Sequence, residues 1–325
     1  MSSPRLGNRR ILACSLLLTM LSGCFGGTAK NVRSEAQTRA DSLLVRAIRA
    51  EQKGDTREAL KMLSEAFSVS ASIEDTHAKA IALINIARLH RLNHEAGPAT
   101  TAIDTALELP VNDGGIFSEA AQEKALILLT TNNADAALPW AEKSAASAND
   151  ALLGRRLNLL GRILLGRNEM AASVPILEKA LKENREHGNA EEEANSLRML
   201  GIVARRKVNN AESERLLAQA LDIDKRIGIS SKISTDLEEL STTARAADNL
   251  TDAASFLERA YEVHIYAKRY QDAGKAKSAL AEISGLQGDD FKAEAARKTA
   301  RELFEKAKNQ QLGTASETIK PSSSP

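Results

Sequence analysis

Apolar residues between Leu197 and Ala220 recur at helical spacing on both sides of a polar break at Asn209-Asn210. The set before the break is Leu197, Leu200, Gly201 and Ala204, and the set after it is Ser213, Leu217 and Ala220. The stretch therefore predicts two helices joined by a turn. Gly201 costs a helix about 1 kcal/mol relative to Ala, which indicates that the second helix packs closely against this position.

The same pattern recurs seven times along the chain, with intervals of 40, 38, 36, 40, 40 and 40 residues. A small residue opens each second helix, and these residues are Ala59, Ala99, Ala137, Ser173, Ser213, Ala253 and Ala293. Twelve residues before each one stands another small residue, and this set is Ala47, Ala87, Ala125, Gly161, Gly201, Ser241 and Ala281. Small residues at both positions let the paired helices cross closely. The sequence thus predicts seven helix-turn-helix units that stack on their neighbours.

This pattern resembles the tetratricopeptide repeat (TPR), whose leucine-glycine step and later A-x3-F pattern match Leu200-Gly201 and Ser213 to Leu217. The interval is longer than the common TPR length of about 34 residues, and the usual tryptophan, tyrosine and closing proline are mostly absent. The longer unit, as in residues 195–223, is similar to the repeats of kinesin light chains. The resemblance implies an all-α, right-handed TPR superhelix over residues 38–310, with first helices lining its inner face. Residues 311–325 lack periodicity and predict a disordered tail.

The N-terminal residues have the order of features found in a secretory signal. Arg5, Arg9 and Arg10 precede an apolar run over residues 11–21 that is too short to span a bilayer stably. Leu21-Ser22-Gly23-Cys24 then resembles the lipobox of bacterial lipoproteins. This resemblance implies a signal peptide over residues 1–23 that is removed, and a lipidated N-terminus and linker over residues 24–37. The alternatives are an ordinary signal peptide or a cytosolic chain with an apolar start.

Lipidation would give the protein a membrane partner through acyl chains on Cys24. Phe25 follows the cysteine where lipoproteins held at the inner membrane of diderm bacteria typically carry Asp. We therefore expect an outer-membrane anchor facing the periplasm in a diderm cell, and otherwise the outer face of the plasma membrane. Ser34 to Gln37 form a candidate capping box for the first helix.

Composition narrows the function classes. Aromatic residues make up 3% of the 325 residues, and only 18 are Gly and 7 Pro, which disfavours a β-rich domain. The formal net charge of +1 gives no global field that would attract nucleic acid, so we expect no nucleic-acid partner. The second cysteine, Cys14, lies within the predicted signal peptide. A mature chain starting at Cys24 could then form no internal disulfide.

Motifs for catalysis or cofactor binding do not occur in the sequence. We find no G-x-S-x-G, H-E-x-x-H, Walker A loop, C-x-x-C or dinucleotide-binding glycine pattern, and we predict a non-enzymatic protein without a cofactor. His90 and His94 have the spacing of two metal ligands on one helix, but no third ligand lies nearby in the sequence. The interpretation we favour places His90 on a packed helix face and His94 in a turn, with no metal.

Basic and amide residues recur at first-helix positions that line the groove in TPR proteins. The residues at these positions are Arg88, Arg91, Arg155, Asn158, Arg162, Asn195, Arg198, Arg205 and Arg206. Arginine can bind carboxylates with two parallel hydrogen bonds, so this set predicts a site for an acidic peptide or protein segment. Reversing the charge at Arg162 and Arg198 together is expected to weaken partner capture without lowering helicity. The alternative is an ordinary helix surface with partners one turn away.

These features together predict a membrane-anchored, non-enzymatic TPR adaptor of the bacterial cell envelope. Its groove would bind a protein or peptide in assembly, secretion or wall remodelling. The alternative is a binding protein for a peptide, glycan or small ligand in the same groove. Glycan grooves usually offer exposed aromatic faces, and a chain with one Trp and three Tyr gives that alternative little support.

Overall fold

The computed structural model describes residues 33–147 and 151–318. These residues form fourteen helices and no strand. The helices in chain order are α1 (Glu35–Gln52), α2 (Thr56–Ser72), α3 (Thr76–Leu92), α4 (Ala96–Glu108), α5 (Gly114–Thr130), α6 (Ala134–Ala146), α7 (Leu153–Gly166), α8 (Met170–Glu186), α9 (Ala190–Arg206), α10 (Asn210–Ile227), α11 (Ser230–Ala246), α12 (Leu250–Tyr266), α13 (Tyr270–Leu286) and α14 (Asp290–Thr318). They correspond to the seven helix pairs predicted from the sequence.

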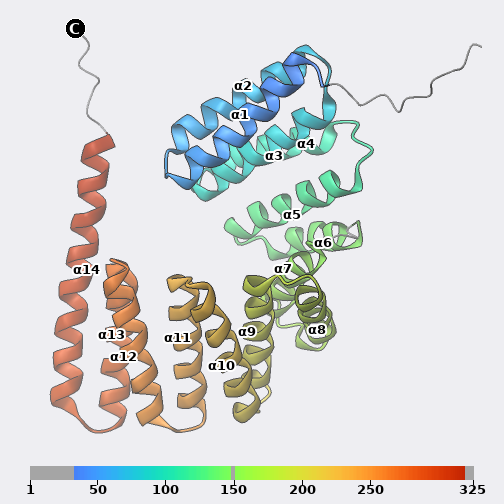
Figure 1. Ribbon diagram of the computed structural model, residues 1–325. Coiled ribbons are helices and arrows are strands. Elements are labelled where there is room, and N and C mark those ends of the chain that lie inside the picture. The colour runs from blue at the N-terminus through green and yellow to red at the C-terminus, as the bar shows by residue number, and fades with distance from the viewer. Residues whose placement is uncertain (1–32, 148–150, 319–325) are drawn as a thin grey trace, which may run out of the picture.

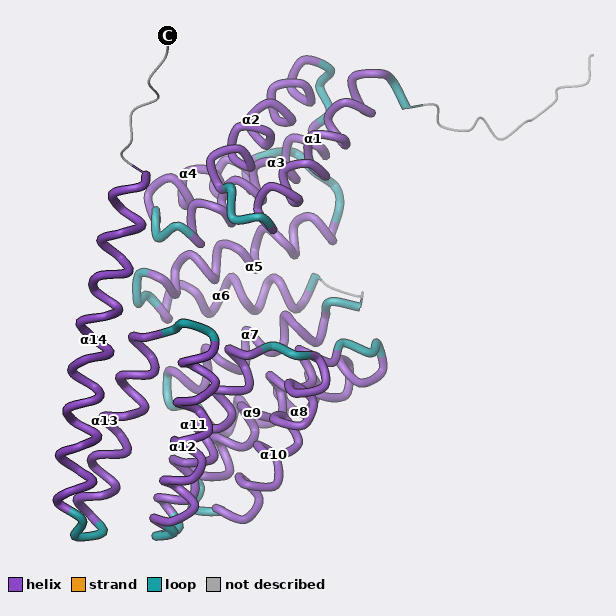
Figure 2. The backbone as a smooth tube through the Cα atoms, turned by 60° about the vertical axis from the view of Figure 1, so that its left-hand side comes forward, coloured by secondary structure: helices purple, strands orange, loops and turns teal. Residues whose placement is uncertain are grey.

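The helix pairs stack in chain order along a curved α-solenoid. Figure 1 shows α1 to α4 at one end, α5 and α6 in the middle, and α7 to α14 following in a row. Extensive contacts join each helix to the next one, and some first helices also contact the next first helix, as in α3 with α5 and α7 with α9. Figure 2 shows the same succession of helix pairs from another side. The core is therefore distributed along the stack, as repeat proteins require.

Close packing within each pair depends on the small residues that the sequence identifies. The openers of the second helices, Ala59, Ala99, Ala137, Ser173, Ser213, Ala253 and Ala293, are all fully buried. A Cβ atom placed at Gly161 would clash with Leu177, and one at Gly201 would lie 2.8 Å from Leu217 Cγ. Both glycines thus permit an approach that no larger residue would allow without movement, which confirms the prediction for Gly201.

The turns between helices share one backbone conformation. Most helices are followed by a residue with positive φ, at a spacing of 20 residues over much of the chain. Glycine fills this position at Gly54, Gly188, Gly228 and Gly288, and it adopts positive φ without steric cost. Val208 occupies the same position after α9 with φ of 62°, where a β-branched side chain is strained.

Both ends of the described region differ from the predicted boundaries. The capping box is confirmed, because Ser34 accepts from the Gln37 amide and the Gln37 side chain accepts from the Ser34 amide, so α1 begins before residue 38. Helix α14 continues to Thr318, past the predicted end of the repeats at residue 310, and the disordered tail stays a prediction. The predicted signal peptide, Cys24, and residues 319–325 lie outside the described residues. No helix within the described residues has the length and hydropathy needed to cross a membrane.

Candidate functional site

Ion pairs join neighbouring first helices along the concave side of the solenoid. Arg88 Nη2 on α3 lies 2.8 Å from Glu51 Oε2 on α1, and Arg91 Nε on α3 lies 2.5 Å from Glu123 Oε1 on α5. Arg205 on α9 pairs in the same way with Glu239 on α11, at 2.7 Å. These three predicted site residues thus have partners in adjacent repeats, rather than the same-helix partners of the alternative interpretation. Their main contribution in this structure is to link successive units.

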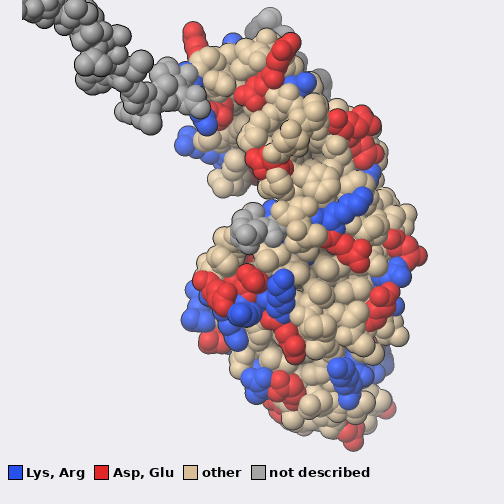
Figure 3. Space-filling view, turned by 90° about the vertical axis from the view of Figure 1, so that its right-hand side faces the viewer, with Lys and Arg blue, Asp and Glu red and all other residues tan. Residues whose placement is uncertain are grey.

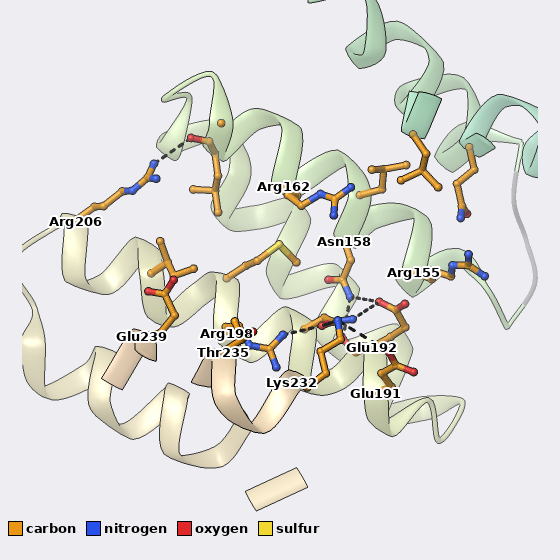
Figure 4. Close-up of a pocket in the computed structure, with 18 residues that line it drawn as sticks. Arg155, Asn158, Arg162, Glu191, Glu192, Arg198, Arg206, Lys232, Thr235 and Glu239 are labelled. Carbon is orange, nitrogen blue, oxygen red and sulfur yellow. Dashed lines mark hydrogen bonds and ion pairs between the residues drawn. The ribbon is translucent and has the colours of Figure 1, made fainter. Parts of the chain in front are cut away.

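Six of the nine predicted site residues line one pocket on this side of the molecule. The pocket has a volume of about 550 Å³, and its lining comes from the four first helices α5, α7, α9 and α11. The predicted residues that line it are Arg155, Asn158, Arg162, Asn195, Arg198 and Arg206. Figure 4 shows that Arg155, Asn158 and Arg162 approach the pocket from one helix and Arg198 and Arg206 from another. The sequence register therefore brings these six side chains to a common site.

Arg198 forms its hydrogen bonds and ion pairs within the protein and is not available to a ligand. Its Nε donates to Asp236 Oδ1 at 2.5 Å, its Nη2 pairs with Asp224, and its Nη1 donates to Asn195 Oδ1 at 2.7 Å. Arg198 is 7% exposed, and both aspartates are fully buried. The sequence-based expectation that Arg198 grips a partner is wrong in this respect, because residues from α10 and α11 already supply its carboxylates. Charge reversal there would disturb the core, so helicity would not be preserved.

The buried cluster of Arg198, Asp224 and Asp236 contains one cation and two carboxyl groups. Burial raises the pKa of Asp236 to about 7, and the hydrogen bond and charge of Asp224 act in the same direction, whereas Arg198 lowers the pKa. One more negative charge than positive would remain in the cluster if both aspartates were ionised, and isolated buried charge is costly. Asp236 is therefore the group that takes up a proton as the pH falls through neutrality.

Asn158 and Asn195 connect three first helices beside this cluster. Asn158 Nδ2 donates to the Glu192 carbonyl at 2.8 Å and to Glu192 Oε2 at 2.9 Å. Asn195 Nδ2 donates to the same carboxylate at 3.1 Å, and Asn195 Oδ1 also accepts from Lys232 Nζ at 3.0 Å. These contacts fix α7, α9 and α11 relative to one another. The two amides thus hold the shape of the pocket.

Arg155 and Arg206 also have partners at the pocket rim. Arg206 Nη1 donates to the Leu165 carbonyl at 3.0 Å. Arg155 Nε and Nη2 both donate to the Gln122 side-chain oxygen at 3.1 Å when that amide is oriented to receive them. Each guanidinium keeps some further donors, since arginine has five N–H groups. Both residues therefore bridge neighbouring first helices while remaining at the edge of the pocket.

Arg162 differs from every other cation in the pocket lining. It is exposed to the pocket, and it makes no hydrogen bond or ion pair with any residue that the structure describes. Desolvation by the surrounding protein lowers its pKa, Arg91 adds to this effect, and Glu192 opposes it. Figure 4 shows Arg162 apart from the hydrogen-bonded groups around Glu192. An anion entering the pocket could accept the hydrogen bonds that this guanidinium does not donate to any described residue.

Apolar side chains form the rest of the lining near Arg162. They come from three helices, and they are Leu126, Leu159, Leu165, Met199 and Ile202. They are not among the predicted site residues, which are all basic or amide residues. The face shown in Figure 3 carries Lys and Arg interspersed with Asp and Glu. The pocket therefore differs chemically from that face by combining an apolar surface with an unpaired cation.

His90 lies near the end of α3, and His94 lies in the turn that follows. His90 Nδ1 on α3 lies 2.5 Å from Glu95 Oε2, and His94 is in the following turn with φ of 63°. Within residues 33–147 and 151–318, His, Cys, Asp and Glu do not gather in threes as metal ligands would. Trp140 packs against a core cluster, and Lys143 Nζ lies 4.3 Å from its ring centre.

Comparison with known proteins identifies similar folds but no similar sequence. No family model matches the chain, and no curated protein matches it. The STAND protein with a tetratricopeptide repeat sensor from Pyrococcus horikoshii is similar over 86% of this chain, with a TM-score of 0.66 and 19% identity. Only 44% of that longer protein is covered, so this chain spans less than half its length.

Two further structures extend this comparison. A Rap protein complexed with Competence and Sporulation Factor is similar over 82% of this chain and 77% of its own, with a TM-score of 0.62 and 12% identity. A putative kinesin light chain from Podospora anserina is similar over 61% of this chain and 99% of its own, with a TM-score of 0.51 and 15% identity. The predicted architecture is thereby confirmed, and this chain has the fold of tetratricopeptide repeat proteins.

Proposed function

We propose that the protein is a non-enzymatic scaffold that binds a protein or peptide partner in its concave pocket. The observation that carries this proposal is the pocket itself, because four successive first helices build it and leave Arg162 without a partner among the described residues. An accessible apolar surface with a few convergent polar groups is the usual composition of a binding site. The Rap structure, which contains Competence and Sporulation Factor, supports the capacity of this fold to hold such a ligand.

Site-specific crosslinking in cells tests the scaffold proposal. A photoreactive p-benzoylphenylalanine is placed at Ile202, which lines the pocket, and in a matched control at Lys179, which is exposed on α8 and lies outside it. We expect one or a few proteins to crosslink at Ile202 and not at Lys179, with mass spectrometry identifying them. Equal protein crosslinking at both positions, or none at Ile202, would count against a protein partner in the pocket.

We further propose that acyl chains on Cys24 anchor this scaffold in the cell envelope. The support is the order of basic residues, apolar run and Leu21-Ser22-Gly23-Cys24 in the sequence. Helix α1 begins at Glu35, eleven residues after Cys24, and a segment of that length spans at most about 40 Å. Anchoring would therefore keep the first repeat near the membrane and hold the pocket at the envelope.

Metabolic labelling tests the anchor independently of partner binding. Cells that express the full chain are grown with an alkyne analogue of palmitate, and the purified protein is examined for label. We expect label on the native protein and none on a Cys24→Ser variant, which should also leave the membrane fraction. Separation of the inner and outer membranes then tests the expected location in the outer membrane. Label that persists in the Cys24→Ser variant would contradict the proposal.

A further inference from the structure

Ion pairs from one arginine position cross three of the six junctions between successive first helices. Four residues after the small residue at the centre of each first helix, Arg91, Arg205 and Arg245 each reach a glutamate on the next first helix. The pairs are Arg91 with Glu123 at 2.5 Å, Arg205 with Glu239 at 2.7 Å, and Arg245 with Glu282 at 3.3 Å. These contacts neutralise the cations of the concave surface at the α3–α5, α9–α11 and α11–α13 junctions.

Apolar residues replace this pairing at the two junctions in between. The positions equivalent to Arg91 hold Leu129 on α5 and Leu165 on α7. The positions equivalent to Glu123 hold Leu159 on α7 and Met199 on α9. Leu129 packs with Leu159 in one core cluster, and Leu165 packs with Met199 in another. The pocket lies across this interruption, because its lining includes Leu159, Leu165 and Met199.

The same interruption explains why Arg162 has no partner. Arg162 and Arg88 occupy equivalent positions, each directly after the central small residue of its helix. Arg88 pairs with Glu51 on the preceding first helix. The residue equivalent to Glu51 in the unit before Arg162 is Leu129. The repeat architecture thus supplies a carboxylate to Arg88 and a hydrocarbon side chain to Arg162.

We propose that Arg162 binds a carboxylate of an extended peptide segment of a partner protein, and that apolar side chains next to this carboxylate occupy the surface formed by Leu126, Met199 and Ile202. This inference rests on the proposed function and names the chemistry that the pocket selects. The carboxylate of the ligand would pair with Arg162 as Glu51 pairs with Arg88, because the preceding repeat has Leu129 at the position of Glu51. Arginine binds carboxylates with two parallel hydrogen bonds. Burial of the neighbouring apolar side chains of the peptide against the apolar lining adds to the binding free energy.

The carboxylates of the pocket lining already have partners. Glu239 pairs with Arg205, Glu191 lies 3.9 Å from Lys232 Nζ, and Glu192 accepts from two asparagines. Arg162 makes no such contact with a described residue, so a single carboxylate directed at Arg162 complements the lining. A volume of about 550 Å³ lies within the range of ligand pockets. A short segment with one acidic residue between apolar residues fits this lining and this volume.

A peptide array tests the proposed chemistry with the full chain. The probes are immobilised pentapeptides whose central residue is Asp, Glu, Asn or Gln, with Leu, Phe, Ser or Lys in all combinations at the flanking positions. The native chain is compared with Arg162→Gln and with Arg215→Gln. Arg215 is the matched control, because it is exposed on α10, pairs with Glu212 on its own helix and lies outside the pocket.

We expect the native chain and R215Q to prefer Asp or Glu with Leu or Phe flanks, and R162Q to bind those peptides about tenfold more weakly. Binding that is equal for acid and amide probes, unchanged in R162Q, or absent from every peptide would overturn the inference. Free octanoate that displaces the protein from the array as well as the best soluble pentapeptide does would indicate a small carboxylate ligand instead of a peptide.

A second variant tests the inference without removing Arg162. Leu129→Glu places a carboxylate where Arg88 has Glu51, and we expect it to pair with Arg162 and to lower binding of the acidic peptides. Thermal unfolding confirms that the variant is folded. If folded L129E binds the acidic peptides as tightly as the native chain does, the ligand carboxylate does not bind beside Arg162 as proposed. A further outcome is that a probe at Ile202 still crosslinks to a protein in cells although R162Q binds the acidic peptides as well as the native chain does. In that case the scaffold proposal stands and this inference fails.

Discussion

Arg162 on α7 and Arg198 on α9 lie on successive first helices and line the same pocket, yet their environments are opposite. Arg198 is buried against Asp224 and Asp236, whereas Arg162 is exposed and has no partner among the described residues. Periodicity brings both cations to the pocket, but the side chains that adjacent helices supply decide their roles. Asp224 and Asp236 make Arg198 structural, whereas Leu129 stands where Arg88 has Glu51 and gives Arg162 no carboxylate.

Removing each arginine is the strongest way to test this contrast. Arg198→Ala leaves two fully buried aspartates without their cation, and breaking such a buried pair costs about 3–5 kcal/mol. Arg162→Ala removes no hydrogen bond or ion pair with a described residue, and substitutions at exposed positions usually stay within about 0.5 kcal/mol. Urea unfolding followed by circular dichroism measures both. Similar losses of unfolding free energy in the two variants would contradict the assigned roles.

The pH dependence of stability separates the two regions further. The folded pKa of Asp236 is about 7, above the ordinary value of 3.8, so the folded state binds a proton more tightly than the unfolded state. This contribution is fully present below a pH of about 4 and is lost as the pH rises to about 7. We expect the unfolding free energy to show this fall in the native chain and in R162Q.

Asp236→Asn removes the titrating group and is the matched test of that assignment. Its unfolding free energy should lack this fall, and we expect the variant to be more stable than the native chain at pH 8, where native Asp236 is ionised. Urea unfolding at a series of pH values provides the measurement. A pH profile for D236N identical to that of the native chain would assign the dependence to other groups.

The helix contact directly beside Arg162 gives a smaller expected effect. Gly161→Ala should destabilise the protein by about 1–2 kcal/mol, because the added methyl group meets buried Leu177. Gly285→Ala is its control, since nothing lies within 4 Å of a Cβ there, and it should stabilise α13 by roughly 0.5–1 kcal/mol. Thermal unfolding of both variants checks this. A stabilised G161A would show that α7 and α8 are packed less closely than described.

The smallest effect is expected in the turn that ends the helix of Arg198. Val208→Gly relieves a positive φ of 62° at a position that is 82% exposed, and we expect a gain of about 0.5–1 kcal/mol. Peptide binding at Arg162 should not change, so the variant separates stability from recognition. Thermal unfolding and the peptide array provide the two measurements. A loss of stability would indicate that the Val208 side chain contributes packing at this turn.

Local patterns were sufficient to predict the helix pairs, because both helical periodicity and the small crossing residues are visible within one repeat. Local patterns were not sufficient to predict the ion pairs of the arginines. Arg198 pairs with carboxylates 26 and 38 residues away in the sequence, and the distance between these groups depends on the rotation between repeats. The apolar interruption at Leu129, Leu165 and Met199 was present in the sequence register. The predicted site residues are all basic or amide residues, so they do not include this interruption. At the C-terminal end, α14 continues to Thr318, past the residue at which the repeat pattern ends.

The most direct test of the central claim is the affinity of the protein identified by crosslinking at Ile202, measured by biolayer interferometry. Native chain, R162Q and R215Q are compared at equal concentration and ionic strength. The pocket described here predicts about tenfold weaker binding for R162Q and unchanged binding for R215Q. Equal affinity of the native chain and R162Q would show that Arg162 does not receive the partner.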